Sequence, residues 1–184
     1  MATKAEQNPP LKTQTRFLVG HAALRTLGIA AALIAIGLMT TGKQAVELLG
    51  FQLVAKYSYS PILRYFVIIS TIACGLSALS LGCFLYSVRS INPGRKNYFT
   101  IFVIDLVVVG LALTGSSAAT AMGYVGRYGD SHAGWMPICG TFGRFCDRMT
   151  VSVAFSFFAA VVYMGLAVWS AWIASEAHLS NTIY

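Results

Sequence analysis

Four long runs of apolar residues alternate with short polar segments along the chain. The runs cover residues 19–41, 62–87, 98–122 and 151–173. Each reaches the roughly 20 residues that an α-helix needs to cross the hydrocarbon core of a bilayer. Lipid offers the backbone no hydrogen-bonding partner, so a spanning segment must satisfy its own N–H and C=O groups as a helix. The pattern therefore predicts an all-α protein, a membrane bundle of four transmembrane helices.

The prolines support this division of the chain. All five lie outside the runs or at their edges: Pro9, Pro10, Pro61, Pro93 and Pro137. We therefore expect unbroken helices, because a proline inside a helix removes a hydrogen bond. The first run exceeds the roughly 7–15 residues of a signal-peptide core, so we interpret it as a retained span. The expected organisation is a polar tail (1–18), a four-span domain (19–174) and a second tail (175–184).

Composition and charge agree with a lipid environment. The chain is 57% hydrophobic and 10% charged, whereas soluble domains carry about 25% charged residues. The formal charge is +7, but the basic residues lie mostly between the apolar runs, where lipid headgroups would meet them. Because no basic stretch is interleaved with aromatic residues, we expect membrane lipid as a partner and not nucleic acid.

Charge bias alone does not set the orientation in the membrane. Lysines and arginines divide evenly between the two sides, so the positive-inside rule gives no answer. Two features favour a cytoplasmic N-terminus. The shortest loop, between the second and third runs, is the most densely basic, and the last loop carries Cys139 and Cys146, which suit an oxidising exterior. We therefore predict that both termini are cytoplasmic.

Two charged residues lie inside the apolar runs. Arg25 is about six residues into the first run and Asp105 about seven into the third. The two helices cross the bilayer in the same direction, so the charges should lie at similar depth, near 9–10 Å from one face at about 1.5 Å per residue. An unpaired ion inside a membrane costs several kcal/mol. We therefore predict an intramembrane ion pair between Arg25 and Asp105.

Two alternatives remain open for these residues. Arg25 could extend its long side chain to the headgroups, and Asp105 could be protonated and therefore neutral. Paired charges that cancel suit the fixing of helix register better than the movement of an ion. The pair nevertheless leaves a small transporter or channel as an alternative function.

Small residues at four-residue spacing mark faces where helices approach closely, because lipid removes the hydrophobic drive and favours tight backbone contact. The helix-packing residues that we expect are Gly28, Ala32, Ala78, Gly82, Gly115, Ala119 and Gly123. These faces could pack inside the bundle or between protomers, and packing inside the bundle is the simpler expectation.

The last loop offers the clearest covalent feature. Cys139 and Cys146 are seven residues apart, and an extracellular location would favour a disulfide between them, the alternative being two free thiols. A zinc site formed by these cysteines and His132 would lack a clear fourth ligand. No catalytic triad, phosphate loop or pair of catalytic carboxylates is present in the sequence. We therefore expect no enzyme activity, no bound metal and no cofactor.

The same residues resemble a known plant family, the Casparian strip membrane domain proteins and their CASP-like relatives. The resemblance covers nearly the whole chain. Its first-helix arginine corresponds to Arg25 and its third-helix aspartate to Asp105, and the second outer loop is similar around Trp135, Cys139 and Cys146. The segment from Ala55 to Pro61, followed by Tyr65-Phe66-Val67, resembles the CASP-like branch.

The resemblance implies a multi-pass plasma-membrane protein with cytoplasmic termini that forms homo-oligomers and hetero-oligomers with related members. Strip-forming members act as membrane scaffolds that limit lateral diffusion and organise cell-wall modification. This chain lacks the Phe-Phe signature of their first outer loop. We therefore take from the resemblance the scaffold class and not the building of the strip itself.

Overall fold

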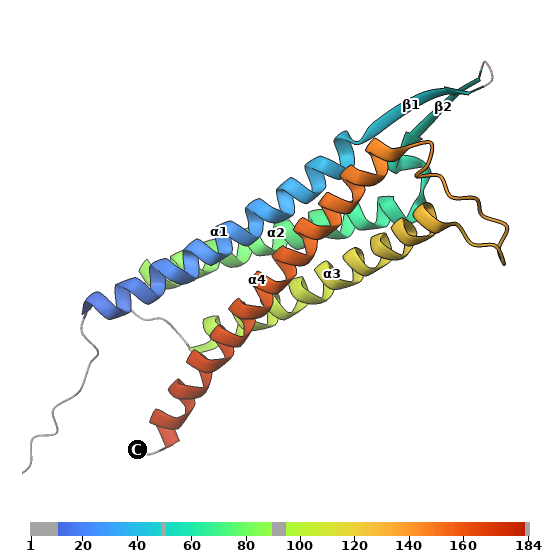
Figure 1. The fold of residues 1–184 in the computed structure, drawn as a ribbon. Coiled ribbons are helices and arrows are strands. Elements are labelled where there is room, and N and C mark those ends of the chain that lie inside the picture. The colour runs from blue at the N-terminus through green and yellow to red at the C-terminus, as the bar shows by residue number, and fades with distance from the viewer. Residues whose placement is uncertain (1–10, 49–50, 90–94, 183–184) are drawn as a thin grey trace, which may run out of the picture.

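The computed structural model describes residues 11–48, 51–89 and 95–182. Four helices run side by side in a long bundle: α1 (Leu11–Thr41), α2 (Pro61–Arg89), α3 (Arg95–Tyr128) and α4 (Gly143–Thr182). Successive helices run in opposite directions, so α1 begins and α4 ends at the same end of the bundle (Figure 1). All four are long and apolar enough to cross a membrane. The predicted four-helix membrane fold is therefore confirmed, while its orientation stays a prediction.

The fourth helix begins earlier than its hydropathy suggests. Residues 143–150 were expected in a loop, but α4 starts at Gly143. Arg144, Asp147 and Arg148 interrupt the apolar run and hide this turn from a hydropathy count. Phe145 and Met149 nevertheless lie four residues apart, on one helical face, and both are buried. The helical period, and not the average polarity, shows where this helix begins.

The other helices also extend into polar sequence. α3 continues to Tyr128, six residues beyond the expected end, so the last loop is reduced to residues 129–142. α1 and α4 extend into the segments that we expected to be polar tails, beginning at Leu11 and ending at Thr182. The helices continue beyond the apolar runs because the hydrogen bonds within a helix do not require apolar side chains.

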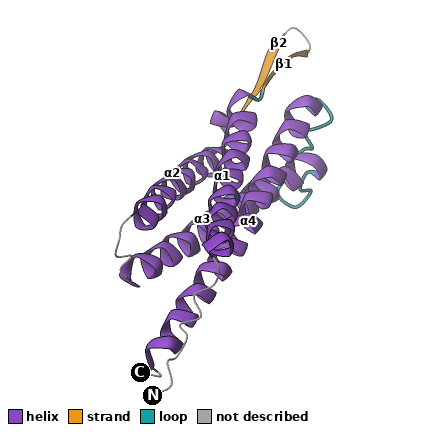
Figure 2. Ribbon diagram, turned by 90° about the vertical axis from the view of Figure 1, so that its left-hand side faces the viewer, coloured by secondary structure: helices purple, strands orange, loops and turns teal. Residues whose placement is uncertain are grey.

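A β-hairpin, which the sequence analysis did not predict, joins α1 to α2. Strands β1 (Lys43–Leu48) and β2 (Phe51–Lys56) pair antiparallel, and a single 3₁₀ turn, η1 (Tyr57–Tyr59), leads into α2. Figures 1 and 2 show the hairpin extending from one end of the bundle, roughly along its axis. The loop between α3 and α4 lies at this same end, which we call the hairpin end.

Two clusters of buried side chains hold the helices together. One includes Val108, Ala159 and Leu166 in the middle of the bundle, and the other, nearer the hairpin, includes Phe66 and Phe145. Much of the remaining apolar surface is exposed, as at Leu79, Val161 and Val168, each about two-thirds exposed. Lipid would cover these outward faces, which is why the helices are apolar almost all round.

Candidate functional site

The structure brings Arg25 and Asp105 together in the interior of the bundle. Arg25 Nη2 of α1 donates to Asp105 Oδ2 of α3 at 2.5 Å. The second guanidinium nitrogen, Nη1, donates to Ser80 Oγ of α2 at 2.5 Å. Ser80 Oγ is also 3.4 Å from Asp105 Oδ1. Three helices therefore meet at one charged triangle, which we call the polar triad.

Burial of the triad decides between the alternatives for Arg25. Its residue exposure is 0%, and that of Asp105 is 1%. An arginine that reached the headgroups would be exposed at its tip, so this structure contains a paired arginine. Removing one partner of a buried pair is strongly destabilising, by about 3–5 kcal/mol, because the other charge is left uncompensated.

Neither Ser80 nor a buried histidine next to the triad was predicted from the sequence. His21 precedes Arg25 by one turn of α1 and is 4% exposed. Its Nε2 is 3.4 Å from Ser170 Oγ of α4, and its ring centroid is 4.6 Å from that of Phe84 in α2. The four-residue spacing of His21 and Arg25 places them on one helical face. That spacing was the available signal for an inward-facing histidine.

Serines continue the polar interior toward the hairpin end. Ser116 Oγ of α3 and Ser156 Oγ of α4 are 2.8 Å apart, and Ser152 Oγ of α4 donates to the carbonyl of Ala35 in α1 at 2.6 Å. Hydrogen bonds between helices in lipid contribute about 0.6 kcal/mol each on average. Together these contacts fix which faces of α1, α3 and α4 meet.

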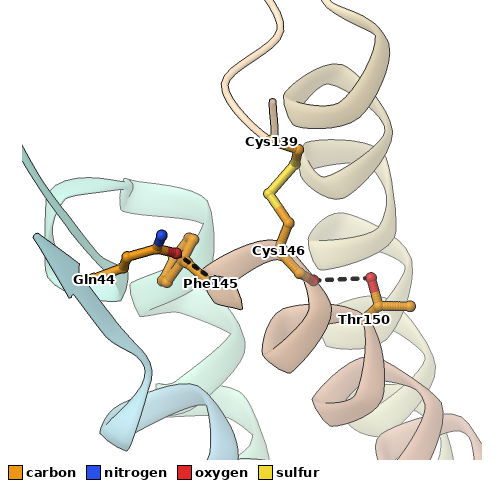
Figure 3. Close-up of a disulfide and its surroundings, with 5 residues drawn as sticks. All are labelled: Gln44, Cys139, Phe145, Cys146 and Thr150. Atoms are coloured by element: carbon orange, nitrogen blue, oxygen red, sulfur yellow. Dashed lines mark hydrogen bonds between the residues drawn. A yellow bond between two sulfur atoms is a disulfide. The ribbon is translucent and has the colours of Figure 1, made fainter. Parts of the chain in front are cut away.

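A disulfide and a hydrogen bond hold the segments of the hairpin end against α4. Cys139 and Cys146 form a disulfide that joins the loop to the first turn of α4 (Figure 3). Gln44 Oε1 of β1 accepts the backbone N–H of Phe145 at 2.9 Å. That N–H belongs to the first turn of α4, where donors lack partners within the helix, and it is shared with the carbonyl of Phe142, just before the helix, at 3.1 Å. The hairpin therefore caps α4 while the disulfide fixes the loop beside it.

The loop itself folds back on a tight turn. Asp130 and Trp135 exchange two backbone hydrogen bonds of 2.9 Å. Gly129 has φ +72°, and an added Cβ there would lie 2.6 Å from the carbonyl oxygen of Trp135. Glycine is required at this position for both reasons. The loop presents Trp135 and Met136 as exposed side chains on a constrained backbone.

A cavity of about 230 Å³ lies beside the disulfide. Its wall includes Arg127 of α3, Asp147 and Thr150 of α4, and Cys146. It is formed at the hairpin end, where α3 ends and α4 begins, and none of the polar triad lines it. The buried charges and this cavity are therefore separate features of the molecule.

The metal alternative finds no support in the described residues. Among them, no group of three or more His, Cys, Asp and Glu side chains lies close enough to hold a metal ion. Cys139 and Cys146 are joined to each other, and the His132 side chain is fully exposed. The three candidate zinc ligands are thus not arranged as a coordination site.

The expected helix-packing residues separate into two groups. Gly28 lies against the ring of Tyr163, Gly115 against Ile69, and Gly123 against Met149. Ala32 and Ala119 are also buried. These five residues occupy contacts inside the bundle.

Ala78 and Gly82 behave differently, and the expectation that they pack inside the bundle is wrong. Both are exposed, and a Cβ on Gly82 would meet nothing within 4 Å. α2 instead turns the face with Ala73, Ser77 and Ser80 inward. The sequence showed small residues on α2 but not which face the other helices cover.

Comparison with known proteins agrees with this architecture. A family model described as the Casparian strip membrane protein domain matches residues 14–162. The chain belongs to the Casparian strip membrane protein family. CASP-like protein 1F1 of Vitis vinifera is 46% identical over 169 residues, covering 91% of this chain and 81% of that protein. CASP-like protein 1F2 of Populus trichocarpa is 45% identical over 171 residues, covering 92% and 93%.

A more distant CASP-like relative extends the comparison. CASP-like protein 1F1 of Arabidopsis thaliana is 36% identical over 149 residues, covering 81% of this chain and 85% of that protein. No solved structure gives a significant match. The resemblance inferred from the residues is therefore confirmed as CASP-like membership in a plant membrane-protein family.

Proposed function

We propose that this CASP-like protein is a non-catalytic scaffold of the plasma membrane. In this proposal it crosses the membrane four times with both termini in the cytoplasm. It self-associates, forms hetero-oligomers with related members, and organises membrane subdomains and the modification of the adjoining cell wall. Family membership supports the scaffold class.

The observation that carries the proposal is the closed polar triad. Arg25 and Asp105 pair at full burial, and Ser80 accepts from the arginine and lies near the aspartate. A transporter of the alternating-access kind more often shows broken helices around a site near the midplane. Here each span forms a continuous helix, and the pair joins α1 to α3. A pair of this kind stabilises one arrangement of helices, as a scaffold requires.

The hairpin end provides the second support. The hairpin and the loop carrying the disulfide lie at one end of the bundle (Figure 1), and contacts from Gln44 and Cys146 hold them against α4. A surface that is already ordered loses little conformational entropy when a partner binds. We assign partner binding outside the cell to this end.

Lateral mobility tests the proposal. A fluorescent fusion should form plasma-membrane patches with slow recovery after photobleaching, and covalent crosslinking in native membranes should capture oligomers. A small transporter using Arg25 and Asp105 predicts the opposite combination: fast recovery, together with solute flux in proteoliposomes that is lost in Asp105→Asn. That combination would refute the scaffold.

A further inference from the structure

Two lysines face each other at the base of the hairpin. The register of the strands pairs Lys43 of β1 directly with Lys56 of β2. Opposed residues of an antiparallel pair have Cβ atoms roughly 4.5–5.5 Å apart, and like charges in such positions repel. Neither ammonium takes part in an ion pair with any residue that the structure describes. The strand register thus places two lysines opposite each other, with no counter-charge paired to them among the described residues.

The two lysines lie on the face of the hairpin that turns away from the bundle. Side chains alternate between the two faces of a strand. Gln44 bonds to the start of α4, and its partner Ala55 packs against the cluster that includes Phe66 and Phe145. Lys43 and Lys56 are the next residues on each strand. Their side chains therefore point to the opposite face, where Lys43 is exposed and Lys56 is half-buried.

The depth of this pair matches that of lipid phosphates. The first span ends at Thr41 and the second begins at Pro61, so the base of the hairpin adjoins the ends of both spans. Tyr59, 70% exposed, lies between Lys56 and the second span. Tyrosine favours the level of the headgroups, with its ring toward the lipid and its hydroxyl toward water.

Two arginines add positive charge near the base of the hairpin. Arg148 Nη1 of α4 is 3.4 Å from the carbonyl of Thr41, and Arg64 Nε of α2 donates to the carbonyl of Ser58. The nearest acid along the hairpin is Glu47, four residues beyond Lys43, or about 13 Å along a strand. Its Oε1 accepts from Gln52 Nε2 at 3.0 Å. The base of the hairpin is therefore a cationic surface at headgroup depth.

We propose that Lys43 and Lys56 form a binding site for the phosphate group of an anionic phospholipid, in the leaflet that surrounds the hairpin end. A phosphate between the two ammonium groups accepts hydrogen bonds from both and removes their repulsion. The acyl chains of the same lipid would lie along the exposed apolar faces of the spans. The lipid thereby attaches the hairpin to the membrane.

Lipid retention in native mass spectrometry tests the site. Purified protein is exchanged into mixed micelles with equal amounts of phosphatidylglycerol and phosphatidylcholine. The parent should retain phosphatidylglycerol severalfold more often than phosphatidylcholine. K43Q/K56Q should lose this preference, whereas the control R127Q/R144Q, which removes two charges at the same end, should keep it. The proposal would be overturned if the parent and K43Q/K56Q showed the same preference for phosphatidylglycerol. It would also be overturned if R127Q/R144Q lost that preference as fully as K43Q/K56Q.

Two further arms separate the site from its alternatives. Displacement of phosphatidylglycerol by inorganic phosphate would identify a free-anion site and refute the lipid assignment. Thermal unfolding shows whether K43Q/K56Q folds: without anionic lipid it should unfold at or above the parental temperature, because the repulsion is gone. Phosphatidylglycerol should then raise the unfolding temperature of the parent and leave that of K43Q/K56Q unchanged.

Discussion

Several polar side chains in the interior of this protein bond to residues of other helices, and the polar triad is the clearest case. Arg25 donates to both Asp105 and Ser80, so its charge is satisfied only while all three helices keep their positions. Lipid cannot replace a lost partner as water would, which makes each contact consequential.

Asp105→Asn should lower the free energy of unfolding by about 3–5 kcal/mol, because it leaves the Arg25 guanidinium buried without a counter-charge. Thermal unfolding in detergent and delivery to the membrane measure the effect. Asp147→Asn, at an exposed position in α4, is the control and should change little. The double variant Arg25→Met/Asp105→Leu should recover most of the loss, since it removes both charges. Parental stability in Asp105→Asn would refute the pairing.

Gly28 and Gly37 make a matched test of close packing within α1. A Cβ at Gly28 would lie 2.9 Å from a ring carbon of Tyr163, whereas at Gly37 it would meet nothing within 4 Å. Gly28→Ala should therefore destabilise the bundle by about 1–3 kcal/mol through overpacking. Gly37→Ala should cost nothing, because alanine is the better helix former. Similar unfolding temperatures for the two variants would contradict this assignment.

Among the elements, α4 depends most on neighbours outside its own helix. Its first turn carries the disulfide, receives a side-chain cap from β1 and inserts Phe145 into the core. The hairpin therefore stabilises a helix far from it in the sequence.

Gln44→Ala should cost about 1 kcal/mol, the usual effect of losing a helix cap. Gln52→Ala is the control on the other strand, since among the described residues the Gln52 side chain bonds to exposed Glu47, and we expect a change within about 0.5 kcal/mol. Hydrogen exchange should locate the loss at Phe145. Unchanged protection of that amide would show that the cap does not stabilise the helix.

At the scale of the whole molecule, one end carries the hairpin and the loop between α3 and α4, while α1 begins and α4 ends at the other (Figure 2). The basic loop used to argue orientation includes Asn92 to Gly94, which lie outside the described residues. The orientation of the protein in the membrane therefore requires a chemical test.

Labelling of intact cells gives that test. A membrane-impermeant maleimide should label Cys139 and Cys146 only after an impermeant reductant has opened their disulfide. Cys74→Ser/Cys83→Ser, which lacks the two free cysteines of α2, should behave identically. Labelling without reduction would argue against the disulfide in the cell. Labelling only after permeabilisation would place the hairpin end in the cytoplasm.

We propose that the exposed small residues of α2 contact another protomer. Ala78→Leu/Gly82→Leu should reduce the yield of crosslinked oligomers severalfold, because larger side chains keep helices apart. Gly110→Leu on α3 is the control, since that glycine is also exposed with nothing near a Cβ. Parental oligomer yields in the α2 variant would exclude this face, and equal losses in both would show a general effect.

The sequence by itself determined the four spans, because a lipid solvent dictates both the length and the polarity of a crossing helix. It also placed Arg25 and Asp105 at matched depth, since depth follows from position along a straight helix. The proximity of Cys139 and Cys146 follows from their short separation in the chain. Each of these properties depends on the position of residues along the chain, which an amino-acid sequence records directly.

Only the tertiary structure decided which faces of the helices meet. In a membrane the lipid-facing and protein-facing sides are both apolar, so hydropathy leaves the rotation of each helix about its axis undetermined. That rotation brought Ser80 to Arg25 and left Gly82 outside. The pairing of Lys43 with Lys56 likewise depends on strand register, a relation between two segments that neither segment specifies alone.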